Sequence, residues 1–258
     1  MNICLPYTAY VNDVFRCLFH DVGLVFTQAP VPGKYTKQIG ETFAGGTLCE
    51  GLAQVLGSLC ECAYLGADTA VLFAPCGACS EQRITQKLAN CLEKNGFSME
   101  LVCFGAYGDG NRMWFKWLKD NTGCSLLEMW DSKRLFYECI QRMEEFLRLK
   151  NASLQNENAK KYIAAAEKEM QQTDSLLRLK ARLSVFNKRL KTVCDMRVLS
   201  RLEQREEPYT TGDYFNLTRT GTFFGFFEKP SFSLFGITDV AGVAPETSCR
   251  WQKAHYLT

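Results

Sequence analysis

The sequence predicts an α/β fold: an open, mostly parallel sheet with flanking helices, followed by a helical segment and a small irregular C-terminal region. Strand-like and helix-like stretches alternate through the first part of the chain. Amphipathic helical patterns without strands fill the middle, and the end is rich in Gly, Thr, Ser and Phe. We therefore expect an α/β cysteine-bearing domain over 1–110, a helical segment over 111–193, and short strands or irregular structure over 194–258.

Each element of the predicted α/β domain has its own local signal. Short apolar runs predict strands at 1–5, 24–27, 69–74 and 99–104. Apolar residues at spacings of three and four predict helices from Val11 to near Gly23, from Thr47 to near Gly66, and over 81–94. The run at 69–74 is apolar throughout, which is typical of a buried parallel strand. The stretch from Pro30 to Gly46 gives no clear prediction.

The start of the second predicted helix has a recognisable capping signal. Thr47 is followed three residues later by Glu50, which matches a capping box with Thr47 as the N-cap. This reading places Cys49 in the first turn of the helix.

The middle of the chain predicts helices only. Residues 126–150 carry an apolar stripe that suits one long helix or two, and 151–172 are polar enough for a solvated helix. Residues 176–190 have an apolar stripe with Lys and Arg between its members, which indicates a solvated charged face rather than an acid-binding surface.

Composition excludes several classes of protein. A chain of 258 residues with 47% hydrophobic residues can bury a sizeable core. Its 30 basic and 28 acidic residues give no nucleic-acid signature, and no apolar run is long enough to cross a membrane. The N-terminus lacks the pattern of a signal peptide, so we expect a cytoplasmic protein. With two histidines, His20 and His255, a Ser-His-Asp triad or a His-based zinc enzyme is not indicated.

The cysteines carry the strongest chemical signal. There are thirteen, an odd number in a chain without an export signal, which disfavours a disulfide framework. Most fit plain core packing, and five of these fall on apolar helix faces or inside predicted strands: Cys60, Cys62, Cys91, Cys103 and Cys139. Cys49 and Cys79 differ because each lies at the predicted start of a helix, where backbone N–H groups favour the thiolate. Cys76, directly after a predicted strand, is the third candidate.

Other uses of these thiols remain open at the sequence level. Cys76-Gly77-Ala78-Cys79 could act as a dithiol or as half of a zinc site, although no second matching pair follows. Cys60 and Cys62 lie on a predicted helix, where their side chains diverge.

Four stretches of the chain form a recognisable set: Thr47-Leu48-Cys49-Glu50, Gly66-Ala67-Asp68-Thr69-Ala70-Val71, Cys76-Gly77-Ala78-Cys79 with Arg83, and Glu93-Lys94-Asn95-Gly96. Through them, the first 150 or so residues resemble the 2-hydroxyacyl-CoA dehydratase superfamily, in particular its branch of CoA-substrate enzyme activases and activase-related proteins. Family members tend to have Gly-Pro-Cys-Arg where this chain has Gly77-Ala78-Cys79-Ser80.

The resemblance implies a cofactor. Cysteines at the positions matched by Cys49 and Cys79 help to hold a [4Fe–4S] cluster in the family, with a third cysteine from a later region. Cys194 is favoured for that third position over Cys124 and Cys249, because it follows the helical segment.

The resemblance also implies a function, single-electron transfer by an iron–sulfur protein. Its expected partners are an ATP-dependent activator protein or a paralogous subunit, with an acyl-CoA as the substrate class. The chain has no P-loop, so we do not expect it to hydrolyse ATP. No catalytic residue is assigned, and whether the chain is itself an enzyme stays open. Two alternatives remain: a cluster-free structural or regulatory relative of the fold, and a thiol or zinc protein that uses Cys76 and Cys79.

Overall fold

A computed structural model describes residues 1–7, 11–48, 50–74, 81–105, 110–153 and 156–193. Within these ranges, four strands form one parallel sheet in the order β2-β1-β3-β4. The strands are β1 (Asn2–Cys4), β2 (Val25–Thr27), β3 (Thr69–Ala74) and β4 (Glu100–Gly105). The prediction of an α/β fold with a parallel sheet is therefore confirmed.

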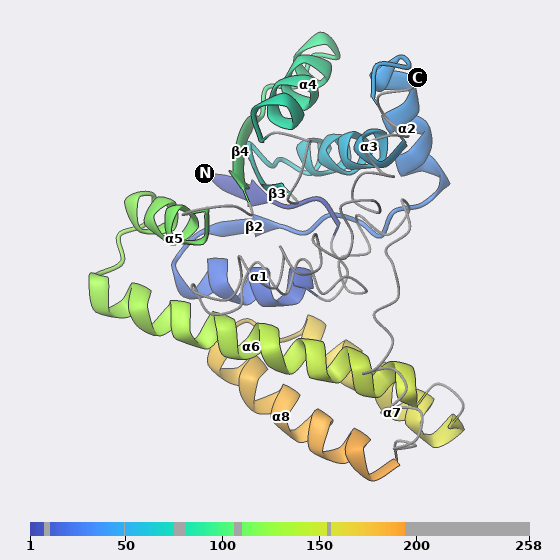
Figure 1. The fold of residues 1–258 in the computed structure, drawn as a ribbon, viewed down its shortest axis with the longest axis vertical. Coiled ribbons are helices and arrows are strands. Elements are labelled where there is room, and N and C mark those ends of the chain that lie inside the picture. The colour runs from blue at the N-terminus through green and yellow to red at the C-terminus, as the bar shows by residue number, and fades with distance from the viewer. Residues whose placement is uncertain (8–10, 49, 75–80, 106–109, 154–155, 194–258) are drawn as a thin grey trace, which may run out of the picture.

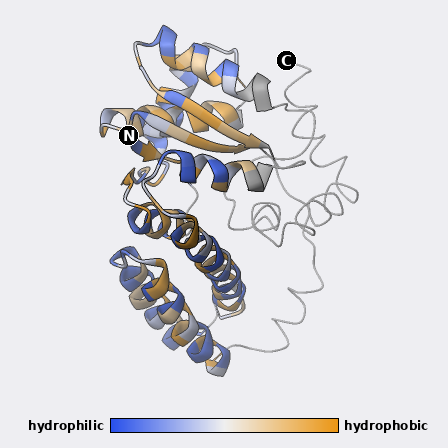
Figure 2. Cartoon of the chain, turned by 90° about the vertical axis from the view of Figure 1, so that its left-hand side faces the viewer, coloured by the Kyte–Doolittle hydropathy of each residue, from blue (hydrophilic) through white to orange (hydrophobic). Residues whose placement is uncertain are grey.

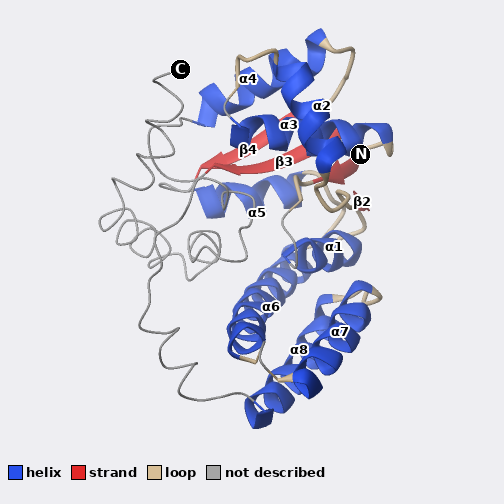
Figure 3. Cartoon of the chain, turned by 90° about the vertical axis from the view of Figure 1, so that its right-hand side faces the viewer, coloured by secondary structure: helices blue, strands red, loops and turns tan. Residues whose placement is uncertain are grey.

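Helices cover both faces of this sheet (Figure 1; Figure 3). One face carries α1 (Val11–Asp21) and α5 (Gly110–Asp120), and the other carries α2 (Lys34–Ala44), α3 (Glu50–Tyr64) and α4 (Glu81–Lys94). Because successive side chains of a strand point to opposite faces, Val71 packs in the α1–α5 core, whereas Ala70 and Leu72 pack in the other core. Both faces are thus apolar, and the two longer strands are mostly coloured hydrophobic in Figure 2.

A second helical layer packs against α1. It consists of α6 (Leu126–Ala152), α7 (Glu157–Gln171) and α8 (Leu176–Val193). The ring of Phe136 on α6 meets that of Phe15 on α1 at a centroid distance of 5.2 Å, and residues of all three helices belong to the same core as α1 and α5. The helical layer is therefore continuous with one face of the α/β unit. The predicted three-part division of the whole chain stays a prediction.

Residues 126–150 were predicted to form one long helix or two. They lie in α6, which is a single helix of 27 residues. Ser125 caps it: the Ser125 hydroxyl accepts from the N–H of Glu128, and the Glu128 carboxylate accepts from the N–H of Ser125. The predicted helix over 151–172 is α7, but it is amphipathic rather than solvated all round. Its buried face consists of Ala159, Ile163, Ala166 and Met170.

The stretch without a clear prediction contains α2, and α3 is described from Glu50. The Thr47 hydroxyl donates to the carbonyl oxygen of Ala44 at the end of α2. The capping box predicted for Thr47 and Glu50 stays a prediction.

Helices α2 and α3 touch through glycines. A Cβ atom on Gly40 would lie 1.8 Å from the carbonyl oxygen of Ala53, and one on Gly57 would lie 2.0 Å from that of Thr36. The two backbones approach this closely because neither glycine has a side chain.

No helix in the described part of the chain is long and apolar enough to cross a membrane.

Candidate metal centre

The order of the strands points to one side of the sheet, where the carboxyl ends of the strands lie. The chain leaves β1 for β2 on one side, then returns past β1 to β3 and β4 on the other side. In such sheets, ligands bind at the carboxyl ends of the strands, where the direction of winding reverses. Here that point lies between β1 and β3. Helices α1, α4 and α5 each follow a strand, so their N-termini lie on this carboxyl side.

Helix α3 also begins on the carboxyl side. Near its end, the N–H of Asp68 donates to the carbonyl oxygen of Asn2 at 3.0 Å, which places the end of α3 beside the start of β1. In its middle, Ser58 accepts from the N–H of Tyr7, three residues beyond β1, at 3.1 Å. Helix α3 therefore runs opposite to β1, and Glu50 lies toward the carboxyl ends of the strands.

All four predicted ligand positions fall outside the described residues: Cys49, Cys76, Cys79 and Cys194. The structure describes their neighbours in the chain. Cys49 precedes Glu50, the first residue of α3, and Cys76 and Cys79 lie in sequence between Ala74 and Glu81, where β3 ends and α4 begins. These flanking residues all belong to the carboxyl side of the sheet. Whether the sulfur atoms meet stays a prediction.

The structure places Cys124 away from that edge. Its thiol is half-buried and lies 3.7 Å from the carbonyl oxygen of Val22, which precedes β2. Val22 lies at the amino ends of the strands, opposite to the end of β3. Cys124 is therefore not positioned as a third ligand beside the residues that follow β3.

The other described cysteines are packing residues. Cys4, Cys17, Cys60, Cys62, Cys91 and Cys139 are buried, and Cys103 is half-buried. Burial raises the pKa of Cys60 and of Cys17 to about 12 and raises that of Cys139 as well, so these thiols remain protonated. A protonated thiol is neither a metal ligand nor a nucleophile. The packing predicted for Cys60, Cys62, Cys91 and Cys139 is confirmed, and Cys103 is only partly covered.

Cys4 and Cys62 form a pair between β1 and α3. The pKa of Cys4 is raised by its hydrogen bond with Cys62 and by burial. Both side chains are fully buried, so the pair belongs to the core between the sheet and α3.

Tyr7 is a residue at the carboxyl side that the sequence analysis missed. It is half-buried, and burial raises the pKa of its phenol, with further increases from the carboxylates of Asp13 and Glu167. Glu167 on α7 pairs with Lys150 on α6 at 2.7 Å. In the sequence, Tyr7 is marked only by its position directly after Pro6, three residues beyond β1.

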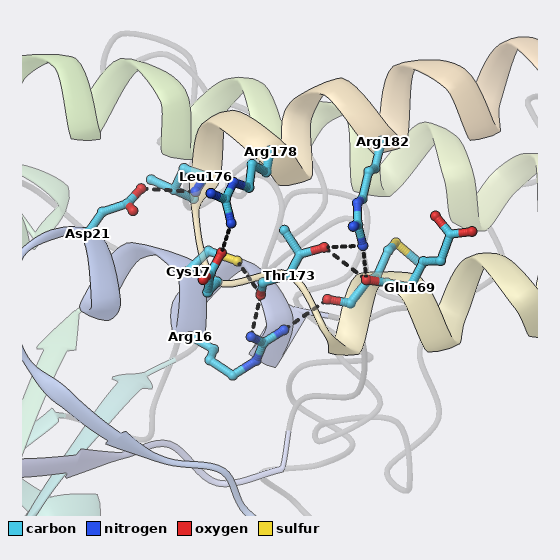
Figure 4. A network of polar contacts seen from close by, with 10 residues as sticks. Arg16, Cys17, Asp21, Glu169, Thr173, Leu176, Arg178 and Arg182 are labelled. Atoms are coloured by element: carbon cyan, nitrogen blue, oxygen red, sulfur yellow. Dashed lines mark hydrogen bonds and ion pairs between the residues drawn. The ribbon is translucent and has the colours of Figure 1, made fainter.

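A polar network joins α1 to the turn between α7 and α8 (Figure 4). Arg16 donates to the carbonyl oxygens of Met170 and Thr173 and pairs with Asp13 at 3.1 Å. The guanidinium therefore satisfies carbonyl groups at the end of α7, where a positive charge is favourable. Burial raises the pKa of the Asp13 carboxyl, whereas Arg16 opposes this shift.

The same network caps the start of α8. Asp21 accepts from the N–H of Leu176 at 2.9 Å, and Cys17 donates its S–H to the carbonyl oxygen of Thr173 at 3.2 Å. Burial raises the pKa of Asp21, while the Leu176 N–H lowers it. These side chains are committed to backbone groups of α7 and α8, so the network is a structural joint rather than a reactive site.

Within the described ranges, no three or more His, Cys, Asp or Glu side chains are grouped so that they could hold a metal ion.

Comparison with protein-family models, with curated proteins and with solved structures found no match.

Proposed function

We propose that the chain is an iron–sulfur protein that carries single electrons, with a [4Fe–4S] cluster held by Cys49, Cys79 and Cys194 and with Cys76 close by. The observation that carries the proposal is the position of the described residues beside three of these cysteines. Glu50, Ala74 and Glu81 all lie on the carboxyl side of the sheet, next to the reversal between β1 and β3.

The available donors suit such a cluster. Of the thirteen cysteines, eight lie in described segments and are buried or half-buried. The remaining five are Cys49, Cys76, Cys79, Cys194 and Cys249. Thiolates are the usual ligands of iron–sulfur clusters, which supply one-electron chemistry whose potential depends on charge, hydrogen bonding and exposure.

In this proposal, the chain holds the cluster and shields it from water. The N-termini of α1, α4 and α5 supply partial positive charge at the carboxyl side, which favours ionised thiols there. Leu5, Phe73 and Phe104, near the ends of three strands, pack in the core below this edge and keep water from the sheet.

The partners follow from the resemblance alone. The proposal includes an ATP-dependent activator protein or a paralogous subunit as the electron source, and an acyl-CoA as the substrate class. No residue of this chain is proposed as catalytic.

The test is anaerobic purification of the full chain after expression with iron–sulfur assembly factors, followed by iron and sulfide analysis and electron paramagnetic resonance of the reduced protein. We expect about four iron and four sulfide ions per chain. Cys49→Ser and Cys79→Ser should each lower the iron content by more than about half. Cys124→Ser is the matched control, because it changes a half-buried thiol at the opposite edge of the sheet.

Other results distinguish the alternatives. Stoichiometric zinc that is lost in Cys76→Ser and in Cys79→Ser would replace the proposal with a zinc protein. A colourless wild-type chain without iron, whose stability and partner binding are unchanged by Cys49→Ser, would indicate a cluster-free relative of the fold.

A further inference from the structure

Helix α8 carries two rows of apolar residues, and only one of them is buried. The helix lies on the far side of the helical layer from the sheet (Figure 1). Its buried row packs in the core and consists of Leu176, Leu179, Leu183, Phe186 and Leu190. The second row consists of Leu177, Ala181 and Val185, which follow one another at a spacing of four on the opposite side of the helix. Leu177 and Val185 are 62% and 61% exposed, so the core does not account for this second row, which we call the α8 outer row.

Positive charge surrounds the α8 outer row. The helix contains six basic residues and no acidic residue. The helical spacing places Arg182 and Arg189 on the flank of the row that faces α7. There, the Arg182 guanidinium donates to the carbonyl oxygen of Glu169 and to the hydroxyl of Thr173. Arg189 lies over the ring of Tyr162, at 4.8 Å from its centroid.

The two flanks of the row differ in how their charges are paired. On the flank that faces α6, Lys180 and Lys191 form ion pairs with carboxylates of α6. Among the described residues, Arg182, Lys188 and Arg189 have no ion pair. The uncompensated positive charge therefore lies along and beside the row, toward α7. A solvated face, as the sequence pattern indicates, would account for these cations but not for the exposed apolar row between them.

An apolar row beside unpaired cations is typical of a contact between two helices of complementary charge. In coiled coils, the apolar stripe makes the contact and the charged residues beside it select the partner. Leu177 and Val185 are about 12 Å apart along the helix axis, and Arg178 and Arg189 are about 16 Å apart, which is two to three turns. The complementary partner is a helix of that length with an apolar stripe and with Asp or Glu along one side. We propose that the outer face of α8 is the docking surface for such an acidic amphipathic helix of another protein.

A layer of phosphates fits this surface less well than a single helix does. The carboxylates that border the row are half-exposed and belong to Glu138, Glu145 and Asp174. An anionic membrane or a nucleic acid would bring its phosphates close to these carboxylates as well as to the cations. A helix with acidic residues along one side places negative charge only opposite the unpaired cations. The proposal concerns the helical layer and does not depend on iron.

Binding of a labelled peptide to the full chain tests the proposal. The probe is a fluorescein-labelled peptide of about three heptads with Leu at positions a and d and Glu at e and g, because its glutamates repel one another and oppose self-pairing. We expect saturable binding by fluorescence anisotropy, which weakens as the ionic strength is raised. A second peptide with Lys in place of every Glu should bind at least about tenfold more weakly.

Matched variants locate the bound peptide. Arg178→Glu combined with Lys188→Glu reverses two charges beside the row and should weaken binding at least about tenfold. Lys87→Glu combined with Lys94→Glu is the control, because it changes the net charge equally at two exposed positions of α4 and should leave binding within about twofold. Val185→Ser removes an apolar contact from the row and should weaken binding about fivefold or more. Far-UV circular dichroism of each free variant verifies that the helices are intact.

Three results would overturn the proposal. The first is the absence of saturable binding of the acidic peptide to the wild-type chain. The second is equal weakening by the two double variants, which would mean that net charge rather than α8 attracts the peptide. The third is tighter binding to duplex RNA, or to phosphatidylcholine vesicles with about one third phosphatidylserine, than to the peptide, when the α8 double variant abolishes it. That result would assign the surface to phosphates.

Discussion

Asp13 shows how one buried carboxyl can set a pH dependence of stability. Its side chain is only 6% exposed and pairs with Arg16, yet its pKa is raised because burial disfavours the charged form more than Arg16 favours it. In the unfolded chain, the pKa of an aspartate side chain is about 3.9. The folded protein therefore holds this proton to higher pH than the unfolded chain does.

The sign of the effect follows from that difference. The stability contributed by the protonated carboxyl is fully present below the unfolded pKa and is lost as the pH rises through the folded pKa. Asp13→Asn cannot titrate, so the free energy of unfolding of the variant minus that of the wild type should increase as the pH rises upward from about 4. Urea unfolding at a series of pH values measures this difference.

Asp131→Asn is the matched control, because it removes one carboxylate from an exposed ion pair on α6. A difference for Asp13→Asn that stays level or decreases with rising pH would contradict the prediction.

At the residue scale, the sequence predicts packing better than polar contacts. Cys60 and Cys91 were assigned to the core because they fall on the apolar stripes of their helices, and both are buried. Asp13 and Arg16 look like ordinary charges on a helix. Their role depends on the carbonyl groups of Met170 and Thr173, more than 150 residues away in the chain, which no local pattern reveals.

At the scale of elements, the close contact of α2 and α3 gives a sharp prediction. Gly57→Ala would place a Cβ atom 2.0 Å from the carbonyl oxygen of Thr36, so the two helices would have to move apart. We expect the free energy of unfolding to fall by about 1–3 kcal/mol, the usual cost of overpacking. Chemical denaturation measures the change.

Gly123→Ala is the control for this substitution. A Cβ atom on Gly123, which lies outside both helices, has no neighbour within 4 Å, so the variant should differ from the wild type by less than about 0.5 kcal/mol. Equal stability of Gly57→Ala and Gly123→Ala would show that the helices do not pack as closely as described.

The elements that were predicted correctly have strong hydrophobic periodicity and clear boundaries. β3 and α4 match their predicted ranges, because a Pro or Gly residue follows an unambiguous apolar run or stripe. Helix α2 was missed because its buried positions include Thr36 and Gly40, which carry no hydrophobic signal. Its packing against α3 replaces the apolar stripe on which a sequence prediction relies. The predicted ligands Cys49, Cys76, Cys79 and Cys194 lie outside the described residues, so their arrangement stays a prediction.

At the scale of the molecule, one core joins the sheet to the second helical layer. Residues of β3, α1 and α5 belong to the same buried cluster as residues of α6, α7 and α8. We therefore expect these parts to unfold together. In a Trp130→Phe, Trp251→Phe background, the fluorescence of Trp114 and Trp117 reports on the sheet side, and far-UV circular dichroism reports mainly on the helices.

The two signals should give coincident urea transitions with the same midpoint and slope. A circular dichroism transition that precedes the fluorescence transition would mean that α6–α8 form a separate folding unit. Arg16→Met, which removes contacts between α1 and the α7–α8 turn, should move both transitions together to lower urea.

The length of α6 has a mechanical consequence. The helix starts beside Cys124 at the amino ends of the strands, and its last turns carry Lys150, which acts electrostatically on Tyr7 at the carboxyl side. A helix of 27 residues is about 40 Å long, so α6 alone spans the sheet from the amino ends to the carboxyl ends of its strands. Because residues along α6 belong to one core with α1, α7 and α8, the helix braces both ends of the sheet against that core.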